Sequence, residues 1–181
     1  KTGGTLDALF NNGAYGVGGA AEDTPTQALR EIFECNFFGW HALTCRAIKT
    51  MRAQGNHGRI VQCSSILGNV IFPFRMAYSA TKFALEAHSA ALRQELYDTD
   101  IAVVLLNTGM VTTAIREKSR AHYTKWITPK VLEKTPAGVA QADAVPKPAR
   151  LKGSFFGPQM MVAFDNGKRW KRLQCVPSQL R

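Results

Sequence analysis

The sequence predicts an α/β fold with a parallel sheet, and three observations support this prediction. Strand-like segments alternate with helical ones in the order strand, helix, strand, helix, strand. The strand-like segments are continuous apolar runs, which are typical of parallel strands buried on both faces. With 181 residues, 45% of them hydrophobic, the chain has the composition of one globular domain. We therefore expect right-handed crossovers and helices on both faces of the sheet.

Three segments are expected to be strands, and each ends at a turn. They are Leu6–Asn11, Arg59–Ser64 and Ile101–Leu106. The first runs into the glycine-rich segment NNGAYGVGG, and Asn107-Thr108-Gly109 follows the third. Glycine and asparagine clusters of this kind mark turns and loops. Three strands are few for a sheet of this class.

Two helices are expected between these strands. In Ile32–Met51, apolar residues recur mostly at three- and four-residue spacing and make one face. Before it, the T-x-x-Q sequence Thr24–Gln27, with Pro25 at the first helical position, predicts a capping box. Tyr78–Tyr97 is rich in good helix formers. Its alanines leave one flat side, which suits packing on another helix or another subunit.

The last third of the chain differs in charge from the rest. Residues 1–115 contain nine basic and nine acidic residues, whereas residues 116–181 contain fourteen basic and four acidic ones. The whole net charge of +10 therefore lies in the second part. Ala114–Trp126 is expected to be one more helix. Prolines then interrupt any period, and only short strand-like fragments such as Met160–Phe164 remain.

Several function classes are disfavoured by what the sequence lacks. No apolar run approaches the ~20 residues of a membrane span, and no spacing of the four Cys and four His residues is typical of a metal site. We expect no metal, a cytoplasmic location and reduced thiols buried among apolar residues. The basic segment Lys168–Arg172 could bind nucleic acid or an anionic membrane, but a solvated tail is the simpler interpretation. Because the chain begins at Lys1 without Met, it is expected to be a piece of a longer protein.

The clearest chemical signal is the pair Tyr78 and Lys82 in the sequence YSATK. A spacing of four places both side chains on one helical face. A neighbouring cation lowers the pKa of a phenol from its usual value of about 10, so Tyr78 could exchange a proton with a substrate oxygen near neutral pH. Most Y-x-x-x-K pairs are solvated helix pairs. This one gains weight because it opens a helix and follows a loop that begins Ser64-Ser65.

Two further polar residues are candidates for the same site. Ser65 lies at the C-terminal end of its strand, where open α/β sheets bind their ligands. Its hydroxyl could hold a substrate carbonyl or alcohol, or could satisfy only the loop backbone. Asn36 lies inside an otherwise apolar helix, where a polar amide requires hydrogen bonds. It is either functional or an amide that is satisfied within the core and bends the helix.

Together these segments resemble the classical short-chain dehydrogenase/reductases. NNGAYG after a strand, ECNFFG around Asn36, GRIVQCSS and YSATK occur in the order and spacing of that family. The resemblance covers about residues 5–115. It implies the C-terminal part of a doubly wound, Rossmann-like sheet whose first βαβ portion and glycine-rich, pyrophosphate-binding turn are missing. We predict an incomplete catalytic domain over residues 1–134 and a basic tail of unassigned structure over residues 135–181.

The resemblance implies a role for each candidate residue. Tyr78 would be the catalytic acid or base, and Lys82 would lower its pKa and hold the nicotinamide ribose. Ser65 would orient the substrate, and Asn36 would hold a water that links Lys82 to bulk solvent. The implied cofactor-binding residues are Asn12, Gly13, Ala14, Tyr78, Lys82, Val111 and Thr113. In the turn after the third strand, Thr108 stands where the family usually has proline.

The implied reaction is hydride transfer between NAD or NADP and an alcohol/ketone substrate. The apolar connection Ile66–Phe74 suggests a lipid-, retinoid- or steroid-like substrate, and the outer faces of the two helices suggest a homodimer or homotetramer of the intact protein. The alternative is a catalytically inactive fragment that acts as an interaction module. Since the pyrophosphate site is missing, we expect the chain alone to bind the cofactor weakly or not at all.

Overall fold

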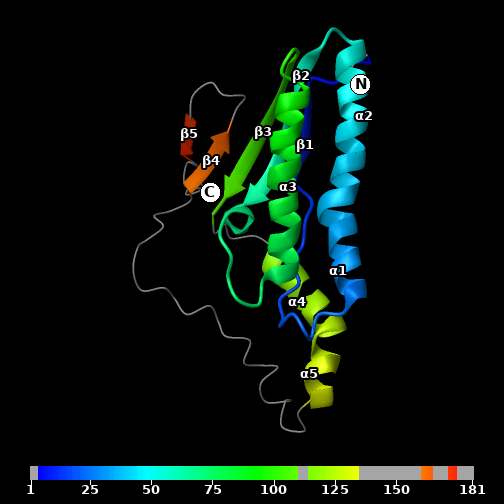
Figure 1. Ribbon diagram of the computed structural model, residues 1–181, viewed down its shortest axis with the longest axis vertical. Coiled ribbons are helices and arrows are strands. Elements are labelled where there is room, and N and C mark those ends of the chain that lie inside the picture. Colours follow the sequence, from blue (N-terminus) through cyan, green and yellow to red (C-terminus); the bar gives the residue numbers. More distant parts are fainter. Residues whose placement is uncertain (1–3, 110–113, 135–159, 165–170, 175–181) are drawn as a thin grey trace, which may run out of the picture.

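The computed structural model describes residues 4–109, 114–134, 160–164 and 171–174 (Figure 1). Its elements follow the chain in this order: β1 (Ala8–Asn11), α1 (Thr26–Phe33), η1 (Glu34–Phe38), α2 (Gly39–Ala53), β2 (His57–Ser65), η2 (Ile66–Gly68), α3 (Met76–Glu95), β3 (Asp100–Thr108), α4 (Ile115–Trp126), α5 (Thr128–Lys134), β4 (Met160–Phe164) and β5 (Lys171–Gln174). The predicted order of three strands and two intervening helical regions is confirmed.

Strands β1, β2 and β3 form the parallel sheet that the sequence predicted. Ile60 of β2 lies opposite Leu9 of β1 and Val103 of β3. Strand β4 pairs antiparallel with β3, and β5 pairs antiparallel with β4. Both lie within residues 135–181. The carboxyl ends of β1, β2 and β3 therefore meet at one edge of the sheet, from which the loops to α1 and α3 leave.

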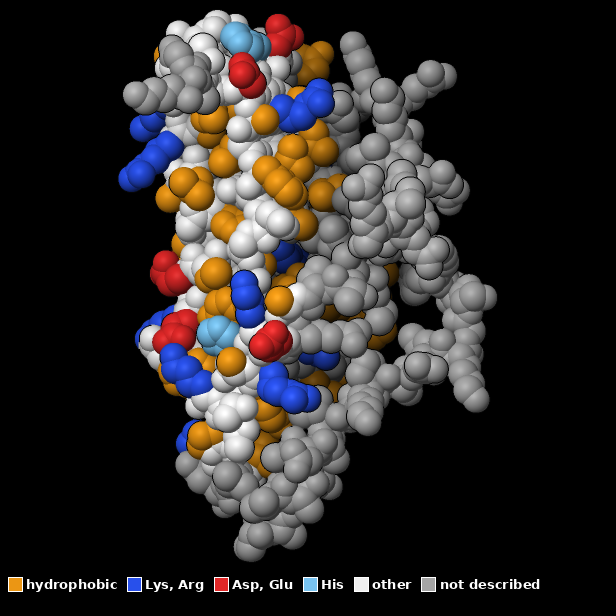
Figure 2. Space-filling view, turned by 180° about the vertical axis from the view of Figure 1, so that it is seen from behind, with side chains coloured by type: hydrophobic (Ala, Val, Ile, Leu, Met, Phe, Trp, Pro, Cys, Tyr) orange, Lys and Arg blue, Asp and Glu red, His pale blue; other side chains and the backbone are white. Residues whose placement is uncertain are grey.

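Helices α2 and α3 pack on one face of the parallel strands (Figure 1). The core between them contains Ala47, Met51, Ile60, Leu92, Leu96, Ile101 and Val103. Buried and half-exposed positions alternate along β2 and β3, so that Val61 and Val104 are only half-buried. Seen from behind, the molecule presents many hydrophobic side chains (Figure 2). Among the described residues, then, helices α2 and α3 cover one face of the sheet and not both, contrary to expectation.

The predicted helix Ile32–Met51 consists of three helical segments. Helix α1 begins at Thr26 with Pro25 as its N-cap and no side-chain cap. The predicted capping box is wrong, because the Thr24 hydroxyl donates to the Ala20 carbonyl at 2.8 Å and closes the preceding turn instead.

A π-helical turn, η1, separates α1 from α2. The Gly39 amide donates to the Glu34 carbonyl across this turn, which adds one residue relative to an α-helical turn. Asn36 lies in the middle of the turn and is fully buried. Such turns are frequent at functional sites.

The second half of the described chain contains two more helices. Helix α4 starts one residue after the predicted start and ends at Trp126 as predicted. No helix in the described ranges is long and apolar enough to cross a membrane. Two of the implied cofactor-binding residues, Val111 and Thr113, lie outside the described residues, and the basic segment Lys168–Arg172 lies partly outside them. The domain boundary after residue 134 stays a prediction.

Candidate active site

Lys82 is a buried cation behind the carboxyl end of β2. Only 2% of its surface is exposed. Its Nζ donates to the Cys63 carbonyl of β2 at 2.7 Å and lies 4.5 Å from the centroid of the Trp40 ring. Burial lowers the pKa of Lys82 from 10.5 to about 8, although Cys63 and two other acidic groups oppose this shift. Lys82 therefore remains mostly charged at neutral pH but loses its proton more readily than an exposed lysine.

Tyr78 lies one turn before Lys82 in α3. The Lys82 Nζ is 5.6 Å from the centroid of the Tyr78 ring. Burial raises the pKa of Tyr78, and a hydrogen bond with the Ser65 side chain partly offsets this. This pKa shift is opposite in direction to the one expected from the sequence. The spacing of four residues predicted the nearby cation, but it could not predict the loss of hydration around the phenol. At neutral pH Tyr78 is thus a neutral phenol, able to donate a proton.

Ser65 satisfies the loop backbone and also contacts Tyr78, while its role in holding a substrate stays a prediction. It is the last residue of β2 and is 8% exposed. Its Oγ accepts a hydrogen bond from the Leu67 amide at 3.2 Å, which caps η2, and its side chain also bonds to Tyr78. Ser64 faces elsewhere, since its hydroxyl donates to a Glu86 carboxylate oxygen. The structure therefore brings Ser65, and not Ser64, to Tyr78.

Asn36 connects the loop after β1 to helix α3. Its Nδ2 donates to the Tyr15 carbonyl at 2.9 Å and to the Thr81 Oγ1 at 3.2 Å, and its Oδ1 accepts from the Tyr15 amide at 3.1 Å. Both amide hydrogens are therefore used within the core. This arrangement matches the interpretation of Asn36 as a satisfied core amide, while its role in holding a water for Lys82 stays a prediction.

The turn Asn12-Gly13-Ala14 lies at the carboxyl end of β1. Asn12 and Gly13 are exposed and Ala14 is half-buried. The Trp40 indole Nε1 donates to the Gly13 carbonyl at 3.0 Å. No atom lies within 4 Å of the position that a Cβ on Gly13 would occupy. The turn therefore leaves open space at this edge of the sheet for a ligand to approach.

Trp40 is a site residue that the sequence did not reveal. It contacts both the turn at Gly13 and the ammonium of Lys82, and only 4% of its surface is exposed. In the sequence it is one more apolar residue on a helical face. The feature of the sequence that could have indicated this contact is the indole N–H, because a buried tryptophan usually donates this group to a hydrogen-bond partner.

Asn11, the first residue of the segment NNGAYG, is buried just before the turn. Its Nδ2 donates to the Thr44 Oγ1 at 3.1 Å and to the Gln62 Oε1 at 2.9 Å, while the Gln62 Nε2 donates to the same threonine oxygen at 3.1 Å. This buried triangle joins β1, α2 and β2 immediately below the turn. These bonds fix the end of β1 and therefore the point at which the chain enters the turn at Asn12.

Helix α4 covers the loop that follows β1. The Gly16 amide donates to the Ser119 Oγ at 3.2 Å, and the rings of Tyr15 and His122 stack with centroids 3.7 Å apart. Tyr78 packs in the same cluster as Tyr123 of α4. The sequence predicted this helix but not its place beside Tyr78. The cofactor-binding roles implied for Val111 and Thr113 concern residues outside the described ranges.

The connection between β2 and α3 presents apolar side chains to solvent. Those exposed are Val70, Ile71, Phe72 and Phe74. Phe74 has a φ of 62°, and its carbonyl accepts a hydrogen bond from the Gly19 amide at 3.1 Å. The connection is therefore tied to the loop after β1, close to the start of α3, whose first turn contains Tyr78.

The three cysteines of the described residues are free thiols, and they are less buried than predicted. Cys35 is exposed, and Cys45 and Cys63 are half-buried; Cys175 lies outside the described residues. The helical turn that contains Cys35 places the side chain of Asn36 inside the core and leaves the side chain of Cys35 exposed. Within the described residues, no group of three or more His, Cys, Asp or Glu side chains is arranged to hold a metal ion.

Comparison with known proteins identifies the family. The family model described as short chain dehydrogenase matches residues 1–124. The chain belongs to the short-chain dehydrogenase family. It is 42% identical over 108 residues to the uncharacterized oxidoreductase YbbO of Escherichia coli K12, covering 60% of this chain and 40% of that protein. It is 39% identical over 110 residues to the rat dehydrogenase/reductase SDR family member 7B, covering 61% and 34% respectively.

Two solved structures share the fold of this chain. A short-chain dehydrogenase from Streptomyces avermitilis matches with a TM-score of 0.55 and 38% identity, over 57% of this chain and 38% of that one. A putative oxidoreductase from Escherichia coli matches with a TM-score of 0.59 and 29% identity, over 61% and 46%. These matches confirm a partial Rossmann-like α/β domain. The chain spans two fifths or less of the length of these two curated relatives.

Proposed function

We propose that the intact protein is an NAD(P)-dependent oxidoreductase acting on an alcohol/ketone pair, and that this chain supplies its catalytic residues. The observation that carries the proposal is the grouping of Ser65, Tyr78 and Lys82 at the carboxyl end of β2. A neutral phenol bonded to a serine hydroxyl, with an ammonium 5.6 Å from the ring centroid, is suited to exchange a proton with a substrate oxygen.

The chain's residues suit the nicotinamide end of such a cofactor. Lys82 would hold the nicotinamide ribose, with Tyr78 beside it, and the open turn at Asn12-Gly13-Ala14 would lie against the adenosine side of the cofactor at the same sheet edge. The cofactor supplies the hydride when it is bound. The sequence contains no T-G-x-x-x-G-x-G turn for the pyrophosphate. It also lacks the residue by which the family selects NAD or NADP, so the proposal covers both cofactors.

The proton transfer follows from the protonation states of the site. In ketone reduction, Ser65 would hold the carbonyl oxygen by a hydrogen bond while Tyr78 donates its proton to that oxygen. The cation on Lys82 would stabilise the phenolate that results. In alcohol oxidation the same proton returns to Tyr78. Asn36 would brace the site, because Thr81, to which it donates, bonds in turn to the Tyr78 carbonyl at 2.8 Å.

The surroundings support finer proposals about substrate and assembly. The exposed apolar side chains of the connection 70–74, tied to the loop after β1, favour an apolar substrate. The outer faces of α2 and α3 expose Leu43 and Phe83, and we propose that they pair with a second copy in a homodimer or homotetramer. A cytoplasmic location is retained as a proposal.

The test compares this chain with one extended at its N-terminus by the missing strands and the glycine-rich turn. Each is titrated with NADH and NADPH by calorimetry, and ketone reduction is then assayed. We expect the short chain to bind neither cofactor at micromolar concentration. Its residues would contact mainly the nicotinamide end, and most contacts to the pyrophosphate and adenosine would come from the missing part. The extended chain should bind one of them and reduce ketones, and Tyr78→Phe should remove that activity without removing binding.

Two outcomes would contradict the proposal. Micromolar cofactor binding by the short chain would show that the pyrophosphate is held by residues within it. An extended chain that folds but binds neither cofactor would favour the inactive interaction module. Tyr97→Phe is the matched control, since Tyr97 is 90% exposed and the same loss of a hydroxyl there should leave activity unchanged.

A further inference from the structure

Trp40 is an aromatic residue that faces the buried cation of the proposed active site. It is 4% exposed, and its ring centroid lies 4.5 Å from the Lys82 Nζ. Its indole Nε1 donates to the Gly13 carbonyl at 3.0 Å. One side chain of α2 thus contacts both the turn after β1 and the ammonium of a residue on α3. The proposed hydride transfer assigns no role to this side chain.

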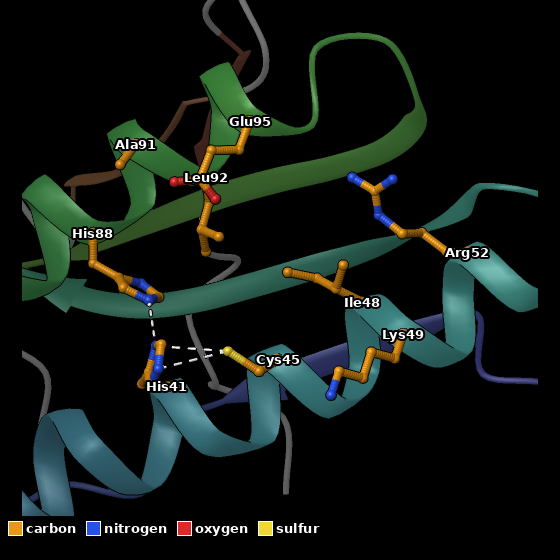
Figure 3. A pocket seen from close by; sticks show the side chains of 9 residues that line it. All are labelled: His41, Cys45, Ile48, Lys49, Arg52, His88, Ala91, Leu92 and Glu95. Carbon is orange, nitrogen blue, oxygen red and sulfur yellow. Dashed lines mark hydrogen bonds between the residues drawn. The ribbon is translucent and has the colours of Figure 1, made fainter.

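The next residue of α2 faces a different part of the molecule. His41 lines a pocket of about 340 Å³ between α2 and α3, to which α3 contributes His88 (Figure 3). Trp40, Tyr78 and Lys82 do not line this pocket. A substitution of Trp40 therefore acts on the interior, and it leaves in place the outer side chains that we propose to pair with a second copy.

The charge on Lys82 has few compensating partners besides the Trp40 ring. Its ammonium donates to the Cys63 carbonyl at 2.7 Å, and within the described part of the chain no carboxylate lies at ion-pair distance from it. The acidic groups whose charge favours the charged form of Lys82 are Cys63, Cys35 and Glu86. The Glu86 carboxylate accepts a hydrogen bond from a serine hydroxyl of β2. A buried ammonium without an ion-pair partner needs other contacts that favour its charge.

An indole ring supplies such a contact. The face of an aromatic ring is its negative side, and tryptophan is the best aromatic partner for a cation. The chain contains a second pair for comparison, since the Lys125 Nζ lies 4.3 Å from the Trp126 ring centroid. However, 54% of the Lys125 side chain is exposed. The attraction increases when water is excluded, so the pair of Trp40 and Lys82 is the stronger of the two.

We infer that Trp40 is a positioning residue of the proposed reaction: its ring keeps the Lys82 ammonium charged, and its indole N–H holds the turn at Gly13. The inference rests on the proposed function, in which the cation on Lys82 stabilises the phenolate of Tyr78. Trp40 acts only through these two neighbours. Without its ring, Lys82 would lose its proton at a lower pH, and the phenolate would then lack its cation.

The test measures the titration of Lys82 in the 181-residue chain without cofactor. Lysines are labelled with ¹³C at Cε, and the NMR signal that is absent from Lys82→Met is the signal of Lys82. In Trp40→Leu the proton affinity of Lys82 should fall about tenfold relative to the wild type, because the charged form loses its aromatic partner. Trp40→Phe should recover most of this loss, since an aromatic face remains.

Two further variants make the comparison decisive. Trp40→Met replaces the ring by a longer apolar side chain and should give the same fall as Trp40→Leu, so the test survives if one variant does not fold. Phe38→Leu is the matched control, because Phe38 is 48% exposed and its loss should leave the titration of Lys82 unchanged. Proton affinity that is unchanged without the ring would overturn the inference. A rise toward that of an exposed lysine would also overturn it, because the ring would then only exclude water.

The protein extended by the missing N-terminal part separates the two contacts of Trp40. Ketone reduction requires the charged form of Lys82, so in Trp40→Leu the alkaline fall of kcat/KM should move to lower pH. In Trp40→Phe the pH profile should stay close to that of the wild type. The Kd of the cofactor should rise severalfold in both variants, because both lose the bond to Gly13. An unchanged Kd in both would overturn the role of the indole N–H.

Failure of this inference and failure of the proposed function give different results. The titration of Lys82 needs neither cofactor nor substrate. An extended protein that folds but reduces no ketone would therefore contradict the hydride transfer alone. An active extended protein whose Lys82 titrates identically in the wild type, Trp40→Leu and Trp40→Met would contradict the role of Trp40 alone.

Discussion

At the scale of single residues, Lys82 shows a conflict between stability and chemistry. It is 2% exposed, and its pKa falls from 10.5 to about 8 on folding. Between these two values the unfolded chain binds more protons than the folded one, so stability rises with pH across this window. Below it, the full penalty of burying the charge is present. The folded chain therefore carries a destabilising cation at neutral pH, which is expected where the charge serves a reaction.

The lowered pKa of Lys82 predicts how the stability of Lys82→Met, relative to the wild type, depends on pH. The wild-type chain should gain about 2 kcal/mol relative to the variant between about pH 7.5 and about pH 9.5, because only the wild type loses a buried proton. Urea unfolding of both proteins at the two pH values measures the difference. Lys49→Met is the control, since Lys49 is exposed. A constant difference between wild type and Lys82→Met would show that Lys82 is hydrated in the folded chain.

At the scale of elements, the junction between α2 and β2 depends on close approach. Gly58 has a φ of +155°, and a Cβ there would lie 2.5 Å from the Met51 sulfur. Met51 is completely buried in the core between α2 and the sheet, so its side chain would have to repack among its neighbours to admit a Cβ. Gly58 thus sets the distance between the end of α2 and the start of β2.

We predict that Gly58→Ala destabilises the chain by about 2 kcal/mol through this overlap. Gly55→Ala is a matched comparison, because Gly55 also has positive φ, +107°, but a Cβ there would meet only the His57 ring, at 3.6 Å. Both substitutions strain the backbone, and only the first crowds the core. Thermal unfolding should show the larger loss for Gly58→Ala. Equal losses would mean that backbone strain alone matters at this junction.

At the scale of the whole molecule, the two hydrophobic clusters lie entirely before residue 135. One contains Met51, Leu92 and their neighbours, and the other contains Ile32, Tyr78 and Ile127. Strand β4 pairs with only three residues of β3, from Leu105 to Asn107. The described parts of residues 135–181, strands β4 and β5, therefore extend the edge of the sheet.

Removal of residues 135–181 should accordingly leave the parallel strands β1–β3 and helices α1–α5 folded. The expected result is a far-UV circular dichroism spectrum of residues 1–134 with the helical signal retained and a cooperative thermal transition. The full chain under the same conditions is the reference. A spectrum without helical signal would show that the tail belongs to the domain and that the boundary after residue 134 is misplaced.

The features that the sequence determined by itself are local or periodic. Apolar runs located β1, β2 and β3, helical spacing located α2 and α3, and the spacing of four placed Tyr78 and Lys82 on one face. Each needs only residues close together in the chain, together with the rule that parallel strands end at one sheet edge. The choice of Ser65 over Ser64 came from the family resemblance, and the contact with Tyr78 agrees with it.

Tertiary structure alone decided how those residues behave. Burial by α4 and the loop after β1 raises the pKa of Tyr78, against the direction that its neighbour Lys82 suggested. Trp40 contacts Lys82 while its indole N–H donates to the Gly13 carbonyl of a segment remote in sequence. Such effects depend on desolvation and on contacts between segments remote in sequence, and neither is encoded in the spacing of any one segment.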